Sequence, residues 1–181
     1  ASYSTAIGSN ALALPSTGAR NTAVGYMAGE GSSGSNFSNG SFLGYNTGIA
    51  LTTGRNNTML GYGAGIAATA GNGHILIGYQ AGDAITTAAR DIVIGYDIDA
   101  PSTTLGGQLT IGNLIFGNGL TATTGTTISG GKVGINKANP AYTLDVNGTT
   151  FSKIFSINGN TTSIPSLTKG DILFAKVAGT V

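Results

Sequence analysis

The sequence contains no cysteine and no tryptophan, and it has little charge. Without cysteine the chain forms no disulfide and offers no thiolate to a metal ion. Charged residues make up 8% of the chain and nearly cancel, which leaves a formal net charge of +1. Proteins that bind nucleic acid or an anionic membrane electrostatically carry a clustered basic surface, whereas the eight Lys and Arg residues here are scattered along the chain. We therefore expect no nucleic-acid partner.

Long apolar runs are missing as well. No stretch reaches the roughly 20 residues that a helix needs to span a bilayer, so we expect no membrane insertion in this segment. The chain is instead rich in glycine, with 31 residues, and 40% of its residues are hydrophobic. These hydrophobic residues recur at fixed intervals, which a disordered polar linker does not do. We expect an ordered chain.

The most informative feature is a repeat built on a glycine that follows a short apolar run, as in Ala23-Val-Gly-Tyr and Met59-Leu-Gly-Tyr. Successive glycines of this kind, called anchor glycines below, recur with a 17-residue period, and one interval in the series is longer by two positions. The anchor glycines are Gly8, Gly25, Gly44, Gly61, Gly78, Gly95 and Gly112. Such a fixed period indicates a stack of structural repeats.

Each repeat contains one apolar run of three or four residues bounded by Gly, Asn and Thr, which is typical of a short strand. Frequent glycine and the absence of a 3.6-residue period exclude a helix. At about 3.3 Å per residue, a 17-residue coil holds two short strands and two turns. The sequence therefore predicts an all-β fold: a parallel β-solenoid, or β-roll, of about seven coils stacked at about 4.8 Å. We place the two-residue insertion in a turn within 30–39.

In-register stacking places equivalent residues of successive coils above one another. The residue after the anchor glycine predicts an aromatic ladder of Tyr26, Tyr45, Tyr62, Tyr79 and Tyr96. The residue before it predicts an apolar column of Ile7, Val24, Leu43, Leu60, Ile77, Ile94 and Ile111. The anchor glycine itself belongs where two backbones approach closely or where φ is positive. We interpret the tyrosine ladder as packing between coils; a platform for stacking sugar rings is the alternative.

A single stack of such coils is expected to be marginally stable. Ordering each residue costs ~1–2 kcal/mol of backbone entropy, whereas burying a Val- or Leu-sized side chain contributes ~1.5–3 kcal/mol. One coil offers few bulky residues; Val24 and Met27 are examples. Packing the apolar column against copies of itself about a threefold axis would supply the missing burial. We therefore predict a homotrimer.

Two motifs resemble known fibre proteins. The repeat Asn21-Thr-Ala-Val-Gly-Tyr-Met-Ala-Gly29 returns as Asn57-Thr-Met-Leu-Gly-Tyr-Gly-Ala-Gly65. It resembles the head repeats of trimeric autotransporter adhesins and, in its spacing and its Gly-Tyr-x-Ala-Gly form, those of phage tail fibres more closely. The segment 131–148 (GKVGINKANPAYTLDVNG) is similar to the neck that precedes an intramolecular chaperone domain in tail-fibre proteins. The resemblance implies a trimeric parallel β-roll or an intertwined triple β-helix on a virion or cell surface.

These features divide the chain into four expected regions. They are a repeat β-solenoid head (1–117), a Gly/Thr-rich transition (118–131), a neck-like β motif (132–150) and a C-terminal β segment (151–181). Within the last region, the stretch 167–179 is similar to β segments of phage tail proteins.

Few residues suggest catalysis. Asp91, Asp97 and Asp99 lie close together in one repeat, and paired carboxylates can cleave glycosidic bonds. We interpret them instead as part of a solvated rim or turn. His74, the one histidine, has no acidic residue or cysteine near it in sequence and is interpreted as a turn residue.

Other kinds of site are equally weakly indicated. The glycine-rich runs lack the strand–loop–helix setting of a phosphate loop, and no Asp recurs as in calcium-binding repeats. The pairs Thr52-Thr53 and Thr86-Thr87 are typical of ice-binding solenoids, but Thr69-Ala70 interrupts them. We expect no catalytic residue, no metal site, no cofactor and no enzymatic activity.

The sequence thus favours a structural and adhesive segment of a trimeric phage tail fibre, located on the virion surface and used in host attachment. Its partners would be two further copies of itself and a host-surface glycan or protein. Two alternatives remain open: a cell-surface adhesin or extracellular filament of a bacterium or archaeon, and a polysaccharide-cleaving tailspike.

Overall fold

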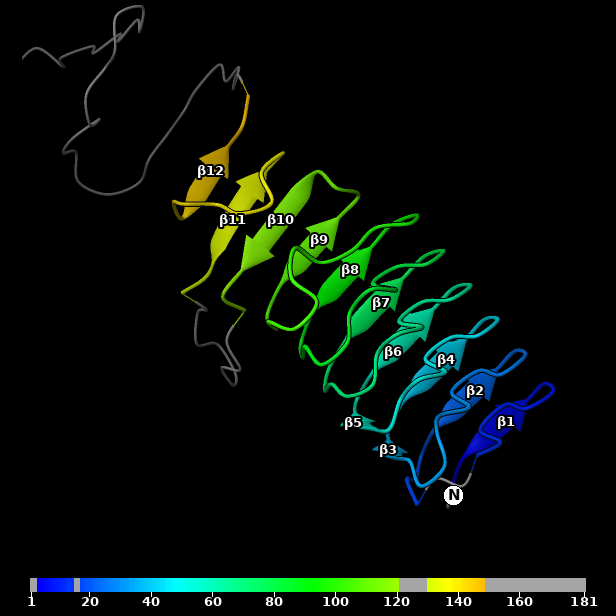
Figure 1. Ribbon diagram of the computed structural model, residues 1–181. Helices are drawn as coiled ribbons and strands as arrows, with labels where there is room; N and C mark the ends of the chain where they lie inside the picture. Colours follow the sequence, from blue (N-terminus) through cyan, green and yellow to red (C-terminus); the bar gives the residue numbers. More distant parts are fainter. Residues whose placement is uncertain (1–2, 15–16, 121–129, 149–181) are drawn as a thin grey trace, which may run out of the picture. The chain divides into compact units, whose positions relative to one another are not determined.

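The computed structural model describes residues 3–14, 17–120 and 130–148. The described part is all β, with twelve short strands and no helix (Figure 1). The strands are β1 (Thr5–Ile7), β2 (Thr22–Val24), β3 (Asn36–Ser38), β4 (Ser41–Leu43), β5 (Thr53–Arg55), β6 (Thr58–Leu60), β7 (Ile75–Ile77), β8 (Ile92–Ile94), β9 (Leu109–Ile111), β10 (Ile115–Asn118), β11 (Lys132–Ile135) and β12 (Leu144–Val146).

Seven of these strands carry the repeat and lie side by side, parallel and in register. They are β1, β2, β4, β6, β7, β8 and β9, in that spatial order. Equivalent residues pair directly: Thr58 with Ile75, for example, which is one 17-residue period further on. Figure 1 shows the coils that join one strand to the next. The predicted parallel β-solenoid is confirmed, with about six complete coils between the seven strands.

The core lies inside the coils. Because side chains alternate along a strand, only the middle residue of each repeat strand points inward, and from β2 to β9 that residue is fully buried. These inward residues are Ala23, Phe42, Met59, Leu76, Val93 and Thr110. The loops opposite fill the remaining space with Ala28, Leu51, Ala64, Ala68, Ala81 and Ile85. Phe37 and Phe42 meet edge to face, with ring centroids 5.6 Å apart.

The extra two residues of the long repeat lie in a turn, within the range expected from the sequence. β3 and β5 form a second, two-stranded sheet in which Asn36 pairs with Thr53. Gly29 and Gly48 occupy equivalent positions, four residues after their anchor glycines, yet Asn36 comes seven positions after Gly29 and Thr53 only five positions after Gly48. The insertion therefore lies in 30–35.

The parallel coils end at β9. The chain turns at 112–114, and β10 runs antiparallel to β9. β11 pairs antiparallel with β10, and β12 pairs parallel with β11. β11 and β12 fall within the region predicted to resemble a neck, and they extend the same sheet. Most of the predicted transition (121–129) and all of the predicted C-terminal segment (151–181) lie outside the described residues.

Candidate functional site

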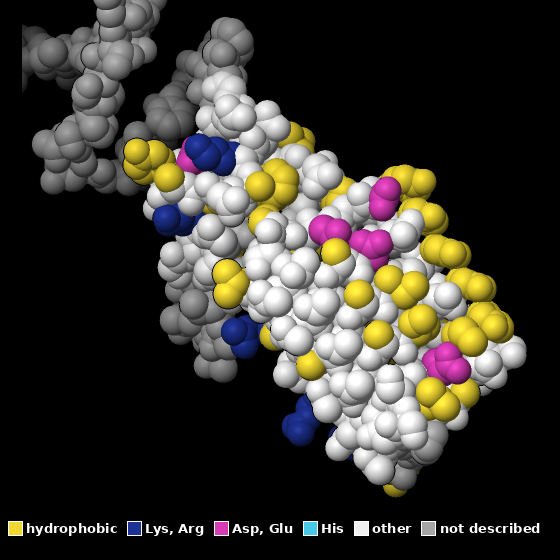
Figure 2. All heavy atoms as spheres, viewed as in Figure 1, with side chains coloured by type: hydrophobic (Ala, Val, Ile, Leu, Met, Phe, Trp, Pro, Cys, Tyr) yellow, Lys and Arg dark blue, Asp and Glu magenta, His cyan; other side chains and the backbone are white. Residues whose placement is uncertain are grey.

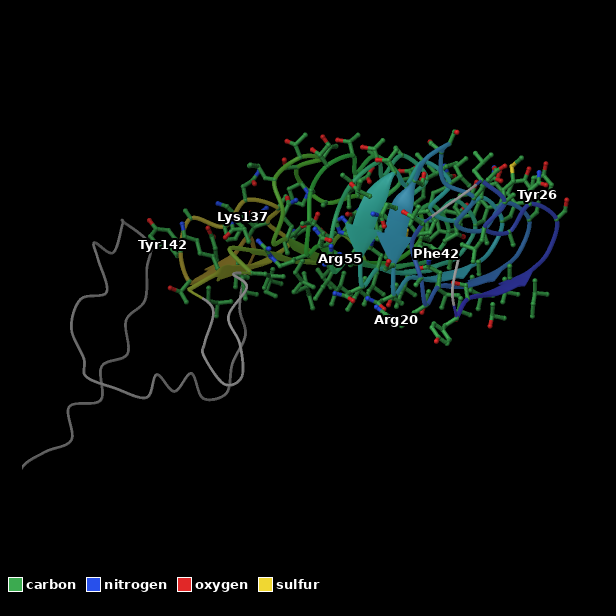
Figure 3. The ribbon with its side chains drawn as sticks, turned by 90° about the horizontal axis from the view of Figure 1, so that it is seen from below. Arg20, Tyr26, Phe42, Arg55, Lys137 and Tyr142 are labelled. Carbon is green, nitrogen blue, oxygen red and sulfur yellow. The ribbon has the colours of Figure 1, made fainter. Side chains whose placement is uncertain are left out.

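The five predicted ladder tyrosines form one continuous stack. Centroid distances between successive rings are 5.1, 5.1, 5.2 and 4.9 Å, and interplanar angles are between 4° and 17°. This spacing follows from the separation of neighbouring strands, which is about 4.8 Å. Figure 2 shows hydrophobic side chains following one edge of the coils, and Figure 3 shows Tyr26 on the outer edge with Phe42 inside.

The stack covers the ring faces of its inner members. Tyr45, Tyr62 and Tyr79 each have a ring on both sides, so their edges and hydroxyl groups face solvent. Tyr96, the last member, is 75% exposed. Burial, reinforced by neighbouring tyrosines and by Asp97 and Asp83, raises the pKa of Tyr79. A sugar that stacks on a ring face would find that face free only at the ends of the row.

The first five anchor glycines, from Gly8 to Gly78, satisfy both conditions expected of them. Gly25, Gly44, Gly61 and Gly78 have φ between +133° and +139°, which L-residues rarely adopt. A Cβ at Gly61 would lie 2.2 Å from the carbonyl oxygen of Gly78 in the next coil. Gly112 differs: a Cβ there would meet nothing within 4 Å, because the chain reverses after β9 instead of adding another coil.

The outer face of the parallel sheet carries no charge and has an apolar column along its whole length. The outward side chains of the seven repeat strands are together called the sheet face below. Its first column comes from the third residue of each strand: Ile7, Val24, Leu43, Leu60, Ile77, Ile94 and Ile111. Its second column comes from the first residue: Thr5, Thr22, Ser41, Thr58, Ile75, Ile92 and Leu109.

These columns are partly open to solvent and carry no charge. Leu43 is 49% exposed and Leu60 39% exposed. The second column changes from Thr and Ser in β1–β6 to Ile and Leu in β7–β9. The apolar strip is therefore one column wide in the N-terminal coils and two columns wide in the C-terminal coils.

Inside the coils lies a ladder of buried polar side chains that was not predicted from the sequence. We call the polar ladder the residues four positions before each anchor glycine: Ser4, Asn21, Gly40, Asn57, His74, Asp91 and Gln108. All of these except Ser4 and Gly40 are buried polar residues. A side-chain atom at one level accepts the backbone N–H at the next, as Asn21 Oδ1 does from Gly40 (2.9 Å) and Asn57 Oδ1 from His74 (3.0 Å). The recurrence of polar residues at the 17-residue period was the signal that could have revealed it.

The position of His74 corrects its interpretation as a turn residue without an acidic partner. Its side chain is fully buried in the polar ladder, and its Nδ1 lies 3.8 Å from Oδ2 of Asp91. The two residues are one period apart in sequence, so the repeat itself brings them together. Burial lowers the pKa of His74, opposed by the hydrogen bond between its ring and the carbonyl of Ala88.

Asp91 was also placed wrongly on a solvated rim. It is fully buried, and its Oδ1 accepts a hydrogen bond from the backbone of Gln108 (2.9 Å). Asp97 lies instead at the surface. Asp99 is half-buried, and its Oδ1 accepts a hydrogen bond from the backbone N–H of Ala84 (3.1 Å). Burial and the nearby carboxylates raise the pKa of Asp99. The three aspartates do not form one surface cluster.

A further row, one period apart in successive coils, consists of threonines. The hydroxyl of Thr52 donates to the carbonyl oxygen of Thr69 (2.6 Å), and the same bond joins Thr69 to Thr86 and Thr86 to Thr103 at 3.2 Å each. The row is regular in spite of Ala70. Its hydroxyl protons are engaged between coils, so the row contributes to stacking.

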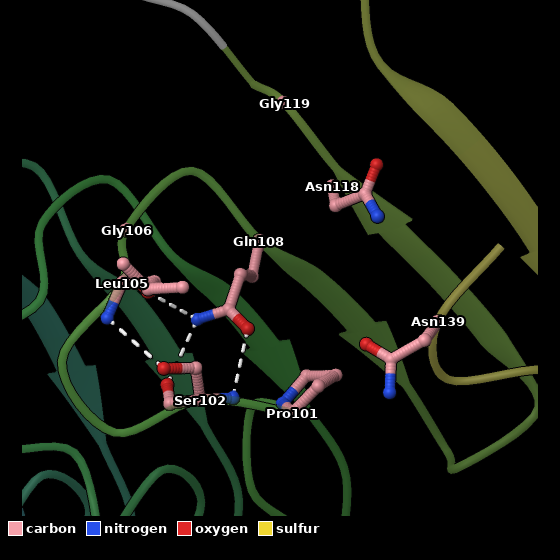
Figure 4. A pocket seen from close by; sticks show the side chains of 8 residues that line it. All are labelled: Pro101, Ser102, Leu105, Gly106, Gln108, Asn118, Gly119 and Asn139. Atoms are coloured by element: carbon pink, nitrogen blue, oxygen red, sulfur yellow. Dashed lines mark hydrogen bonds between the residues drawn. The ribbon is translucent and has the colours of Figure 1, made fainter. Parts of the chain in front are cut away.

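A shallow hollow lies where the last coil meets the neck strands (Figure 4). Gln108 contributes to its lining, but this amide is engaged: its Nε2 donates to the carbonyls of Ser102 (2.8 Å) and Leu105, and its Oε1 accepts from the backbone of Ser102 (2.9 Å). Asn118 and Asn139 complete the polar lining. None of the described residues that line the hollow is ionisable, so they supply no general acid or base.

In the described ranges, no group of three His, Cys, Asp or Glu side chains is placed to hold a metal ion. Over the same residues there is no helix long and apolar enough to cross a membrane. Comparison with protein-family models, with curated proteins and with solved structures finds no match to this chain.

Proposed function

We propose that the chain is a structural and adhesive fibre segment that works as a homotrimer, with the sheet face as the contact between copies. The observation that carries the proposal is the uncharged and partly exposed sheet face, whose first, apolar column runs without interruption along all seven repeat strands. Exposed apolar surfaces of this extent are typical of interaction sites.

A second copy of the same chain is the partner that fits this face best. Its side chains recur at the coil spacing, and a surface with the same spacing interdigitates with it at every level. Burying the exposed half of an Ile or Leu side chain contributes about 1 kcal/mol, half of the value for full burial. Five apolar members of the face, Ile7, Leu43, Leu60, Ile75 and Ile111, are 36–59% exposed, so their burial on assembly would add about 5 kcal/mol per copy. The threefold arrangement is the one that the fibre resemblance implies.

The role in attachment rests on the Gly-Tyr-x-Ala-Gly repeat and the neck-like motif, which favour a phage tail fibre with a host-surface glycan or protein as its receptor. A bacterial or archaeal cell-surface adhesin or filament would use the same trimer. The tailspike alternative has less support, because Asp91 is buried and unavailable to a polysaccharide.

The experiment is to place a charge on the sheet face. Ile77→Asp introduces a carboxylate in the middle of the face, and Asn72→Asp introduces the same charge as the control, at an exposed position that bridges to Arg55 and lies outside the sheet face. We expect sedimentation to show a loss of trimer for Ile77→Asp and an unchanged trimer for Asn72→Asp. A full trimer of Ile77→Asp, equal in stability to the control, would exclude the sheet face as the interface.

A further inference from the structure

The polar ladder contains one pair of ionisable side chains. His74 precedes β7 and Asp91 precedes β8, and both side chains are fully buried. The ladder bonds continue through them: the backbone N–H of Asp91 donates to Nδ1 of His74 (3.3 Å), and that of Gln108 donates to Oδ1 of Asp91 (2.9 Å). Asn57, one level below His74, fills the same position with a neutral amide. The ladder therefore does not by itself require ionisable residues.

The surroundings of His74 specify a neutral ring. Nε2 lies 2.9 Å from the carbonyl oxygen of Ala88. A carbonyl oxygen only accepts, so Nε2 carries the hydrogen. Nδ1 is then the acceptor for the N–H of Asp91. A proton added to Nδ1 would point at that N–H group and remove the ladder bond, and burial disfavours the imidazolium further.

The surroundings of Asp91 favour a protonated carboxyl group. Its Oδ2 has no hydrogen-bond partner among the described residues and lies 3.8 Å from Nδ1 of His74. A buried carboxylate with a bare oxygen is costly, whereas a neutral carboxyl group is much less so. Burial raises the pKa of Asp91 to about 6, against the hydrogen bonds from Gln108 and Gly107 and the charge of Arg90. In the part of the chain that the structure describes, Arg90 is the one charged side chain that acts on the pair.

We propose that in mildly acidic solution the folded chain holds a single proton of the His74–Asp91 pair on the carboxyl group of Asp91, so that the coils tolerate acid without a buried imidazolium. In the unfolded chain the same proton belongs to the imidazole, because free histidine and aspartate titrate near 6.5 and 3.9. At about pH 5 both states then bind one proton through this pair.

The sign of the pH dependence follows from these proton counts. Stability changes with pH only where the folded and unfolded states bind different numbers of protons. For the intact pair the numbers are nearly equal around pH 5, so the pair contributes little slope there. Without Asp91, the imidazole of His74 takes up a proton in the unfolded state and not in the folded state, so stability is lost as the pH falls below about 6.5. Without His74, the carboxyl group of Asp91 takes up a proton in the folded state while it is still ionised in the unfolded state, so stability increases as the pH falls from about 6 to 4.

The proton can be located directly, because His74 is the one histidine in the chain. Nitrogen NMR of the full chain labelled with ¹⁵N-histidine reports the state of each ring nitrogen. We expect the signals of a neutral ring protonated at Nε2, unchanged from about pH 7.5 to 4.5, where free histidine would have become charged. An imidazolium signal in the folded chain at pH 5 would overturn the proposal.

Two substitutions that preserve the ladder separate the partners. His74→Asn and Asp91→Asn each introduce a side chain that the ladder already uses at Asn57. Between about pH 6 and 4.5, the folding equilibrium constant should fall up to tenfold per pH unit for Asp91→Asn and rise by the same factor for His74→Asn. The double variant should resemble the intact chain. Measured relative to the double variant, which carries the slope of other groups such as Asp99, the same sign in both single variants would contradict the shared proton; if neither folds, the NMR result decides alone.

Discussion

Replacing the anchor glycine Gly61 by alanine should disrupt the stacking of the coils. The added Cβ would lie 2.2 Å from the carbonyl oxygen of Gly78 and 2.6 Å from its carbonyl carbon, below the roughly 3.0 Å at which real Cβ contacts stop. Both of these are backbone atoms, so no side-chain rotation relieves the overlap. The φ of +133° adds strain for any L-residue.

The cost of this change can be bounded from the local hydrogen bonds. Separating the two coils by the required distance weakens the bonds from Gly78 N to Leu60 O (2.8 Å) and from Gln80 N to Tyr62 O (2.7 Å). Strained backbone costs about 1–3 kcal/mol and each weakened buried bond about 1–1.5 kcal/mol. We therefore expect Gly61→Ala to lower the free energy of unfolding by about 3–6 kcal/mol, which is a large part of the stability of a typical domain.

The assay is chemical unfolding followed by circular dichroism, with two glycine controls. Gly63 also has a positive φ, but a Cβ there meets only the side chain of Gln80 at 3.5 Å, and Asn46 occupies the equivalent position in the preceding coil. Gly112 is an anchor glycine with no coil above it. Gly63→Asn and Gly112→Asn should each cost about 1 kcal/mol or less. An unfolding midpoint for Gly61→Ala equal to that of Gly63→Asn would refute the close approach of stacked coils.

Further substitutions test the tyrosine stack and the polar ladder. Tyr62→Ala removes two ring stacks and should lower the free energy of unfolding by about 1–3 kcal/mol, and Tyr26→Ala, which removes one stack, by about half as much; unchanged melting with lost attachment to cells would instead identify the tyrosines as a receptor site. Asn57→Ala leaves the N–H of His74 and the carbonyl of Gly71 unpaired in the interior and should cost about 2–4 kcal/mol in thermal or chemical unfolding. A loss below about 0.5 kcal/mol, the least that one net hydrogen bond contributes, would mean that the ladder is not a stabilising element.

Much of the fold was predictable because one glycine set the register. Once Gly61 and Gly78 are aligned, the parallel pairing, the tyrosine stack and the position of the insertion all follow from strand geometry. The glycine recurs because backbone contact leaves no room for a side chain, and such a constraint is visible in sequence.

The buried polar residues were harder to recognise, because their identity changes from coil to coil. Asn57, His74 and Asp91 share no side-chain chemistry except an acceptor that a backbone N–H can reach. Gly40 interrupts the series, since the ring of Phe42 fills the space that a side chain would need. A search for one recurring residue type therefore does not group these residues, although all of them accept a backbone N–H from the next coil. The reversal at β10 carried no signal that we recognised.

The measurement that tests the central claim most directly is the mass of the assembled chain in solution, by native mass spectrometry at micromolar concentration. A chain of 17.9 kDa should give one species of three times that mass. It should persist at dilution, because all seven repeat strands contribute to the interface. A species with the mass of a single chain and an intact β-sheet spectrum would show that the sheet face needs no partner copy and would contradict the trimeric fibre.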